Sequence, residues 1–132
     1  IDLLTNNTKM SQHNLIINCN EKTIFEKNLR GSKITSCKFN NFYICINKYK
    51  KIQMFLYSLT ERNIIINNSV LNVIQEIKND KGYKYYDKLG FSIQGADATM
   101  TLKEIINICK LKNFNIELEI KLENNENIKI VI

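Results

Sequence analysis

The stretch Phe114-Asn115-Ile116-Glu117-Leu118-Glu119-Ile120-Lys121-Leu122 decides the fold class of this 132-residue chain. Apolar residues occupy every second position, and polar residues fill the positions between them. Successive side chains of a strand point to opposite faces, so this pattern predicts a strand with one buried and one wet face. Ile128, Ile130 and Ile132 repeat the alternation. We therefore predict a C-terminal hairpin with strands at about residues 114–122 and 128–132.

The register of this hairpin follows from burial. Both apolar sets share one face only if the loop has an odd number of residues, most simply Asn124–Glu126 with one positive φ angle. Leu122 then pairs near Ile128, and Lys121 lies opposite Lys129. The like charges cost a few tenths of a kcal/mol. Each buried Ile contributes roughly 1.5–3 kcal/mol, so burial outweighs the repulsion.

Two stretches upstream of the hairpin have helical periodicity. Apolar residues at i, i+1, i+4 and i+7 predict a helix over about residues 69–79, and the stripe consists of Val70, Leu71, Ile74 and Ile77. In the second stretch, Thr101 is followed three residues later by Glu104, the pattern of a capping box. An apolar stripe continues from there to Cys109, which predicts a helix over about residues 101–112.

The first half of the chain contains short β-branched or aromatic stretches separated by polar residues, which predict an antiparallel meander. These stretches are Asn14–Cys19, Lys22–Lys27, Ser32–Cys37, Phe39–Ile46, Ile52–Tyr57 and Asn63–Asn67. Gly31 and the doublet Asn40–Asn41 fit turn positions, because Gly and Asn tolerate positive φ. A small solenoid is the alternative, but no segments align at a fixed period.

These elements predict an α+β fold in which the two helices pack on the apolar faces of the sheet or sheets. The length and the apolar fraction of 44% suit a single domain over residues 1–132. Residues 1–12 show little periodicity, so we expect a loose arm or a short turn there. The chain begins with Ile1 rather than Met and lacks a signal-peptide pattern, so we expect a fragment, a processed product or a chain numbered without its initiator.

The amino-acid composition limits what can be inferred from the net charge. Ile, Asn and Lys number 22, 20 and 17, whereas Arg occurs only twice. These three amino acids have the most A/T-rich codons, so base composition accounts for much of the formal charge of +6. The longest apolar runs have strand length, well short of the roughly 18 residues that span a bilayer. The sequence therefore predicts no membrane segment.

The cysteines also indicate a compartment. Cys19, Cys37, Cys45 and Cys109 form no CxxC pair, and each has apolar neighbours. We expect structural thiols that behave as small buried hydrophobes, with disulfides as the alternative. Reduced thiols favour a cytoplasmic location.

The sequence contains few of the residues and motifs that are typical of catalytic sites. His13 is the only histidine, and it lies in the expected arm, which disfavours metal sites built on several histidines. The chain has no glycine-rich phosphate loop and no GxSxG motif. The small-residue loop between Leu89 and Thr101 resembles a ligand loop, but Asp97 would repel anions there, and a plain connection is the alternative. We predict no catalytic residue, no metal and no cofactor.

Two clusters mix lysine with tyrosine, and they are the candidate partner-binding residues, together with Asp97 of the adjoining loop. The clusters are Lys48, Tyr49, Lys50 and Lys51, and Tyr83, Lys84, Tyr85, Tyr86 and Lys88. Tyrosine stacks on bases and lysine neutralises phosphates, so nucleic acid is one interpretation. Tyrosine is also enriched in the hot spots of protein interfaces. Half-exposed strands in an A/T-biased protein would contain the same residues without any binding role.

The small size, the composition and the missing catalytic equipment resemble the immunity proteins of bacterial toxin–immunity systems, including contact-dependent growth inhibition. The resemblance implies a non-catalytic protein that binds one cognate toxin domain and neutralises it. The runner-up is a small basic nucleic-acid-binding or adaptor domain, whose binding would depend steeply on salt. An enzyme with an unrecognised site is the third class.

Overall fold

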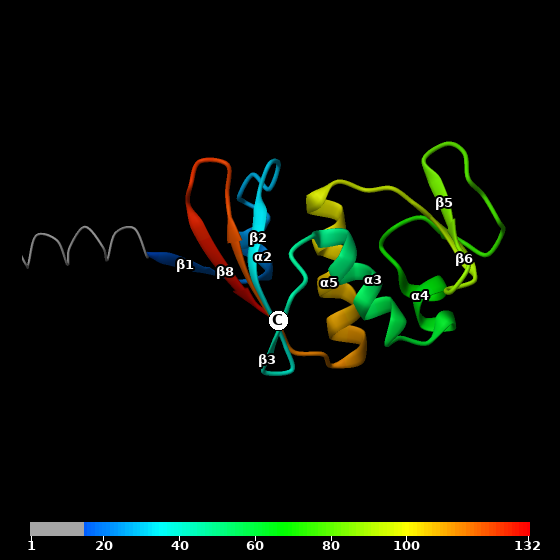
Figure 1. Cartoon of the computed structure of the whole chain (residues 1–132), viewed down its shortest axis with the longest axis horizontal. Coiled ribbons are helices and arrows are strands. Elements are labelled where there is room, and N and C mark those ends of the chain that lie inside the picture. The colour runs from blue at the N-terminus through cyan, green and yellow to red at the C-terminus, as the bar shows by residue number, and fades with distance from the viewer. Residues whose placement is uncertain (1–14) are drawn as a thin grey trace, which may run out of the picture.

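The structure, a computed structural model, describes residues 15–132 and confirms the α+β class. A five-stranded sheet has the order β1-β8-β7-β2-β3, and a three-stranded sheet has the order β4-β6-β5. Figure 1 shows the helices α3 and α5 between the two sheets. The expected arm at residues 1–12 and His13 lie outside the described residues.

The bounds of the elements are as follows. The strands of the large sheet are β1 (Ile16–Cys19), β2 (Lys33–Phe39), β3 (Phe42–Ile44), β7 (Ile116–Lys121) and β8 (Asn127–Val131). Those of the small sheet are β4 (Val73–Ile74), β5 (Tyr83–Tyr86) and β6 (Phe91–Gln94). The helices are α2 (Glu21–Ile24), α3 (Tyr49–Ser58), α4 (Arg62–Asn68) and α5 (Ala98–Lys112).

The C-terminal hairpin is confirmed, but its register differs from the prediction by two residues. Ile120 pairs with Ile128, and Glu119 rather than Lys121 lies opposite Lys129. The loop is odd, as burial requires: the amide of Leu122 donates to the carbonyl of Glu126 at 2.8 Å, which closes a loop of Glu123–Asn125. Asn125 has the one positive φ angle of this loop, 69°. This register keeps the apolar faces together and replaces the repulsion between two lysines by an attraction between opposite charges.

The large sheet is not purely antiparallel. β1 runs parallel to β8, with Ile17 opposite Ile128. β2 pairs with β7 on one side and with β3 on the other, in antiparallel register. The turn between β2 and β3 is the predicted doublet Asn40–Asn41, with φ angles of 47° and 71°. Two positive φ angles define the tight turn that best matches the twist of a hairpin.

Three predicted strands of the first half are wrong, because two are helical and the third is a short helix followed by a turn. Residues 22–27 begin within α2, where Asn20 and Thr23 form a capping box with two bonds of 2.8 Å. Residues 52–57 belong to α3, and residues 63–67 belong to α4. The buried residues of α3 recur with helical spacing and face α5, and they are Ile52, Gln53, Leu56 and Tyr57. Packing of this face overrides the β propensity of the branched and aromatic residues.

The predicted helix over residues 69–79 is also wrong. The segment is extended, and its only regular element is β4, which pairs with β6. The hydroxyl of Ser92 donates to the carbonyl of Glu76 at 2.6 Å and accepts from the amide of Lys78 at 2.9 Å. Ile77, which the helical stripe would bury, is 71% exposed. The main-chain N–H and C=O groups of this segment form hydrogen bonds with the small sheet instead of within a helical turn.

The predicted helix over residues 101–112 is confirmed, but it begins three residues earlier. Asp97 is the N-cap residue, and its carboxylate accepts a hydrogen bond from the amide of Met100 at 2.9 Å. Thr101 and Glu104 therefore lie inside α5 and form no capping box. The helix ends at Asn113, whose left-handed conformation is typical of a C-cap.

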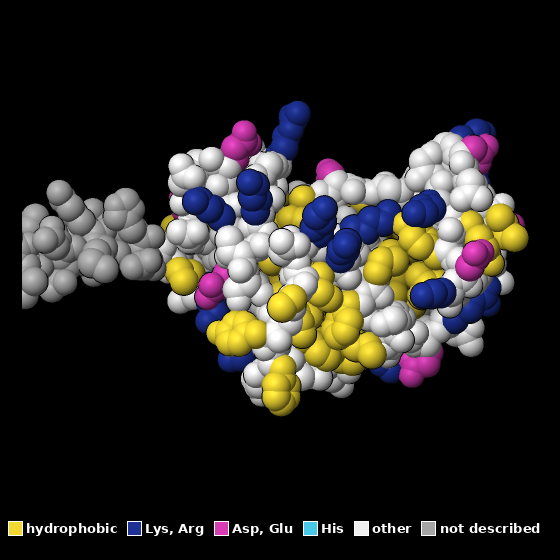
Figure 2. Space-filling model, viewed as in Figure 1, with side chains coloured by type: hydrophobic (Ala, Val, Ile, Leu, Met, Phe, Trp, Pro, Cys, Tyr) yellow, Lys and Arg dark blue, Asp and Glu magenta, His cyan; other side chains and the backbone are white. Residues whose placement is uncertain are grey.

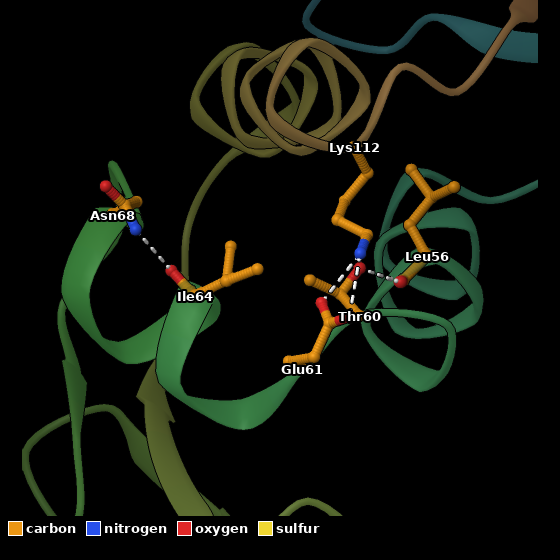
Figure 3. A network of polar contacts seen from close by, with 6 residues as sticks. All are labelled: Leu56, Thr60, Glu61, Ile64, Asn68 and Lys112. Atoms are coloured by element: carbon orange, nitrogen blue, oxygen red, sulfur yellow. Dashed lines mark hydrogen bonds and ion pairs between the residues drawn. The ribbon is translucent and has the colours of Figure 1, made fainter.

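A polar clamp joins the ends of three helices (Figure 3). Lys112, the last residue of α5, donates to both carboxylate oxygens of Glu61 at 2.7 and 2.9 Å. Glu61 is the N-cap residue of α4, and Thr60 before it donates to the carbonyl of Leu56 in α3 at 2.6 Å. These contacts link the end of α5 to the beginning of α4 and to the end of α3.

One cluster of buried side chains includes residues from both sheets and from α3 and α5. The residues with almost no exposure include Ile93 of the small sheet, Leu56 of α3, Ile105 of α5 and Ile120 of the large sheet. Figure 1 places α5 centrally, so its apolar residues can contact both sheets. None of the helices within residues 15–132 combines the length and the apolar character needed to cross a bilayer.

Candidate functional site

The two clusters of lysine and tyrosine meet in the structure at Tyr86. Lys50 lies in the first turn of α3, and its Nζ is 5.4 Å from the centre of the Tyr86 ring. Lys84 of β5 places its Nζ at the same distance from that ring. A lysine over an aromatic face within about 6 Å gains a cation–π attraction. Residues from two distant parts of the sequence thus form one surface.

The position of β5 follows from its turn. Lys81 and Gly82 have φ angles of 53° and 83°, and the amide of Tyr83 donates to the carbonyl of Asp80 at 2.9 Å. This tight turn reverses the chain, so that Lys78 lies 4.8 Å from the centre of the Tyr83 ring. Sequence reasoning missed Lys78, because residues 69–79 were predicted to form a helix. Gly82 was the signal in the sequence that could have revealed the chain reversal, because glycine is common in tight turns.

We use the name lysine–tyrosine surface for the predicted clusters and Lys78. Side chains alternate along β5, so this surface has two sides, with Lys84 and Tyr86 on one face of the strand and Tyr83 and Tyr85 on the other. Its members are Lys48, Tyr49, Lys50, Lys51, Lys78, Tyr83, Lys84, Tyr85, Tyr86 and Lys88. Figure 2 shows basic side chains in a band over the beginning of α3 and toward the small sheet, above an apolar area over the rest of α3. The lysines of this surface take part in none of the ion pairs found among residues 15–132. None of these ion pairs therefore neutralises their charges.

The local charge is unfavourable for α3. Its first turn contains no acidic residue, and Lys48 at the N-cap makes no side-chain capping bond. The N-terminus of a helix carries partial positive charge, so each nearby lysine costs about 0.3–1 kcal/mol at low ionic strength. Lys50 and Lys51 add to this repulsion. The beginning of α3 is therefore stabilised by its packing rather than by its charges.

Two tyrosines of this surface, Tyr49 and Tyr86, pack against the core, although the buried hydroxyl of Tyr86 has no hydrogen-bond partner. The hydroxyls of Tyr49 and Ser32 share a hydrogen bond of 2.7 Å, and Tyr49 packs against the core. Burial raises the pKa of Tyr49, and the bond with Ser32 partly offsets that rise. The amide of Tyr85 donates to the side chain of Asn79 at 2.9 Å. Rigid aromatic side chains lose little entropy on binding, which suits them as anchors.

Asp97 has a different position from the other candidates. It caps α5 and borders a surface hollow of about 360 Å³, beside Val70, Gln94 and Met100. Within the described residues, no hydrogen bond or ion pair connects Asp97 with the lysine–tyrosine surface. Its carboxylate occupies the helix N-terminus, where a bound anion would otherwise sit. The loop before α5 is thus a capped connection.

Glu104 is a polar centre that the sequence did not indicate. It is fully buried, and its two carboxylate oxygens accept from the hydroxyls of Tyr57 and Ser69, the amide of Val70 and the side chain of Asn107. Burial and the carboxylate of Glu104 raise the pKa of Tyr57. All of these partners come from the protein, and they join α3, α5 and the segment after α4. Glu104 therefore holds these elements together.

The four cysteines are all thiols. Burial raises the pKa of Cys37 to about 11 and that of Cys109 to about 12. The expectation that every cysteine is buried is wrong for Cys45, which is exposed in the connection from β3 to α3. In the part of the chain that the structure describes, no three His, Cys, Asp or Glu side chains gather as a metal site requires.

Comparisons of the chain with protein-family models, with curated proteins and with solved structures found no match.

Proposed function

We propose that this protein is a non-catalytic binding module, and that it acts as a cytoplasmic immunity protein that binds and neutralises one cognate toxin domain. The single observation that carries the proposal is the meeting of Lys50 and Lys84 at the ring of Tyr86. Such a surface presents exposed cationic charge beside half-buried tyrosine side chains. A partner with carboxylates around an apolar patch would complement it.

The ring contacts favour a protein over a nucleic acid. A base stacks on an open aromatic face, but Lys50 and Lys84 lie over Tyr86, and Lys78 lies over Tyr83. Stacking would first have to displace these ammonium groups. Arginine, which binds phosphate and guanine through two parallel hydrogen bonds, is absent from this surface. The nearby Arg62 already donates to the carbonyl of Gly90 at 2.7 Å.

The charge predicts how the partner associates. Lysines at the rim of an interface mainly accelerate encounter with an acidic surface, whereas well-packed aromatic residues slow dissociation. A toxin domain entering the cytoplasm must be captured before it acts, so rapid association serves neutralisation. The partner of this immunity protein would present acidic residues to the lysine–tyrosine surface.

The test uses the product of the reading frame immediately upstream of the gene for this chain, which the proposal predicts to contain the toxin domain. Its association with the purified chain is measured by surface plasmon resonance, and protection is measured by growth of cells that express the toxin domain. The double substitution Lys50→Ala and Lys84→Ala should lower affinity by about tenfold or more, mostly through the association rate. Lys121→Ala, an exposed lysine on the large sheet, is the matched control and should change affinity less than twofold.

Two results would contradict the proposal. One is the absence of binding and of protection with that toxin domain. The other is submicromolar binding of generic RNA or DNA whose affinity falls steeply with salt, which would assign the surface to nucleic acid.

A further inference from the structure

The strand β3 forms one edge of the five-stranded sheet and has unusual composition for an edge. Within residues 15–132, β2 is the only strand that pairs with it. The five residues Phe42–Ile46 are all apolar, and Phe42 and Tyr43 are 76% and 75% exposed. Natural proteins protect exposed edges with short strands, charged residues, proline or bulges, because unpaired main-chain groups attract another strand, and of these devices β3 has only its length of three residues. Phe42–Ile46 contains no charged residue and no proline.

The main chain at this edge is oriented for pairing. In a two-residue hairpin, the residue pair that closes the turn is hydrogen-bonded, and this pair is Phe39 and Phe42. Hydrogen-bonded and non-hydrogen-bonded pairs alternate along an antiparallel ladder. The next pair, Lys38 and Tyr43, is therefore of the second kind, and the N–H and C=O groups of Tyr43 face away from β2. They are unused by the sheet.

A groove lies beside this edge. It has a volume of about 340 Å³, and its walls are Thr35–Cys37 of β2 and Tyr43–Asn47 of β3 and the following connection. β3 pairs only with the last three residues of β2, so β2 extends past it. An extended segment that pairs with β3 would continue into this groove. The exposed rings of Phe42 and Tyr43 would contact its side chains.

Charge decides which segment fits. Between Gly31 and Thr60 the chain contains five lysines and no aspartate or glutamate. A second copy of the chain would bring these lysines against one another, apart from Lys38, which Glu117 of β7 opposes. Lys48, Lys50 and Lys51 directly follow the edge and belong to the lysine–tyrosine surface. The complementary occupant is an acidic protein segment.

We propose that the partner adds an extended strand to β3, and that acidic residues beside this strand contact the lysine–tyrosine surface. The inference rests on the proposed function and specifies how the toxin domain is held. Main-chain bonds to Tyr43 supply affinity, and the lysines select an acidic partner. This is the general chemistry of strand addition to an open sheet edge.

The experiment distinguishes the contribution of the Tyr43 main chain to binding from the contribution of its side chain. Tyr43→Pro removes the outward N–H without removing a bond between β2 and β3, whereas Tyr43→Ala removes only the ring. With the same toxin domain, Tyr43→Pro should bind about tenfold more weakly than Tyr43→Ala. Circular dichroism checks that both variants are folded. In the unmodified complex, hydrogen exchange at the amides of Tyr43 and Cys45 should slow at least tenfold.

The outcomes distinguish the two proposals. If the toxin domain binds, but both Tyr43 variants bind equally and the two amides exchange as in the free chain, strand addition is wrong and the proposed function stands. If no toxin domain binds, the proposed function fails and strand addition fails with it. A dimer of the chain alone that Tyr43→Pro abolishes would assign the edge to a second copy and overturn the charge argument.

Discussion

Glu104 shows at the scale of one residue how a buried charge can define a fold. Its carboxylate accepts from Tyr57 of α3, from Ser69 and Val70 after α4, and from Asn107 of its own helix. A carboxylate without such donors would be very costly to bury. The donors lie in segments that are distant in sequence, so the side chain determines where the chain turns after α4.

Replacing this carboxylate should destabilise the protein strongly. Glu104→Ala leaves the hydroxyls of Tyr57 and Ser69 and the amide of Val70 without an acceptor, so we expect the free energy of unfolding to fall by about 3–5 kcal/mol. Urea denaturation followed by circular dichroism measures the change. Glu123→Ala removes an exposed carboxylate and should change stability by less than about 0.5 kcal/mol. A loss below 1 kcal/mol for Glu104→Ala would contradict the assigned role.

At the scale of elements, the sequence predicted those whose pattern is long and local. The strand at residues 114–122 and the helix at residues 101–112 each repeat their period several times, and neither needs a distant residue to define it. Asn40–Asn41 was predictable for a similar reason, since asparagine tolerates the positive φ angles that the turn requires. The register of the C-terminal hairpin was off by two residues, because parity alone does not decide whether the odd loop is Glu123–Asn125, as observed, or Asn124–Glu126, as predicted.

The elements predicted wrongly depend on distant partners. Ile64–Ile66 has high β propensity, yet the segment is helical because Ile65 packs into the core. Residues 69–79 have a helical stripe, but Glu104 holds Ser69 and Ser92 holds the main chain at Lys78. Neither contact is visible in a local pattern. Tertiary contacts override propensity where a segment is short.

The candidate site was predictable only in part. The lysines and tyrosines were identified because they are clustered in the sequence. The contacts of Lys50 and Lys84 with Tyr86 depend on the packing of α3 beside the small sheet, which no local pattern shows. The free edge at Tyr43 was missed, because strand order determines which strand is an edge.

The clamp between α4 and α5 makes a testable prediction about pH. Hydrogen bonds from Lys112 are the main cause of a lowered pKa at Glu61. A lowered pKa in the folded state means that the clamp stabilises above the unfolded value and weakens as pH falls through the folded value. In Lys112→Met, the pKa of Glu61 should rise toward its usual 4.5. Carbon-13 NMR titration of the carboxyl group measures it.

The matched control is Lys121→Met, which removes a lysine that takes part in none of the ion pairs among residues 15–132. It should leave the titration of Glu61 unchanged. An identical pKa in Lys112→Met and in the unmodified protein would show that the clamp does not form in solution.

At the scale of the whole molecule, one buried cluster connects the two sheets through α3 and α5. The small sheet contributes Ile93 and Phe91 to it, and Tyr57 of α3 lies edge-on to Phe91 with ring centres 6.0 Å apart. A shared core couples the stability of its parts, since neither sheet can lose its packing without exposing the apolar residues of the other. We therefore expect residues 15–132 to unfold as one unit.

Ile93→Ala tests this coupling from the small sheet. It should lower the free energy of unfolding of the whole chain by about 2–5 kcal/mol, because it creates a cavity in the shared core. Far-ultraviolet circular dichroism and tyrosine fluorescence should report one coincident transition in urea, before and after the substitution. Two separate transitions, or a loss confined to one probe, would mean that the sheets unfold independently.

The exposed thiol of Cys45, at the end of the β3 edge, makes this position a natural attachment point for a fluorophore. Cys37 and Cys109 are buried, and their raised pKa values disfavour the reactive thiolate. A maleimide dye should therefore react first with Cys45 in the native protein, and Cys19→Ser would remove the half-buried competitor. Binding of a partner strand to β3 would then change the emission of the dye. The fraction of chains with a bound partner could therefore be followed in real time without altering the core.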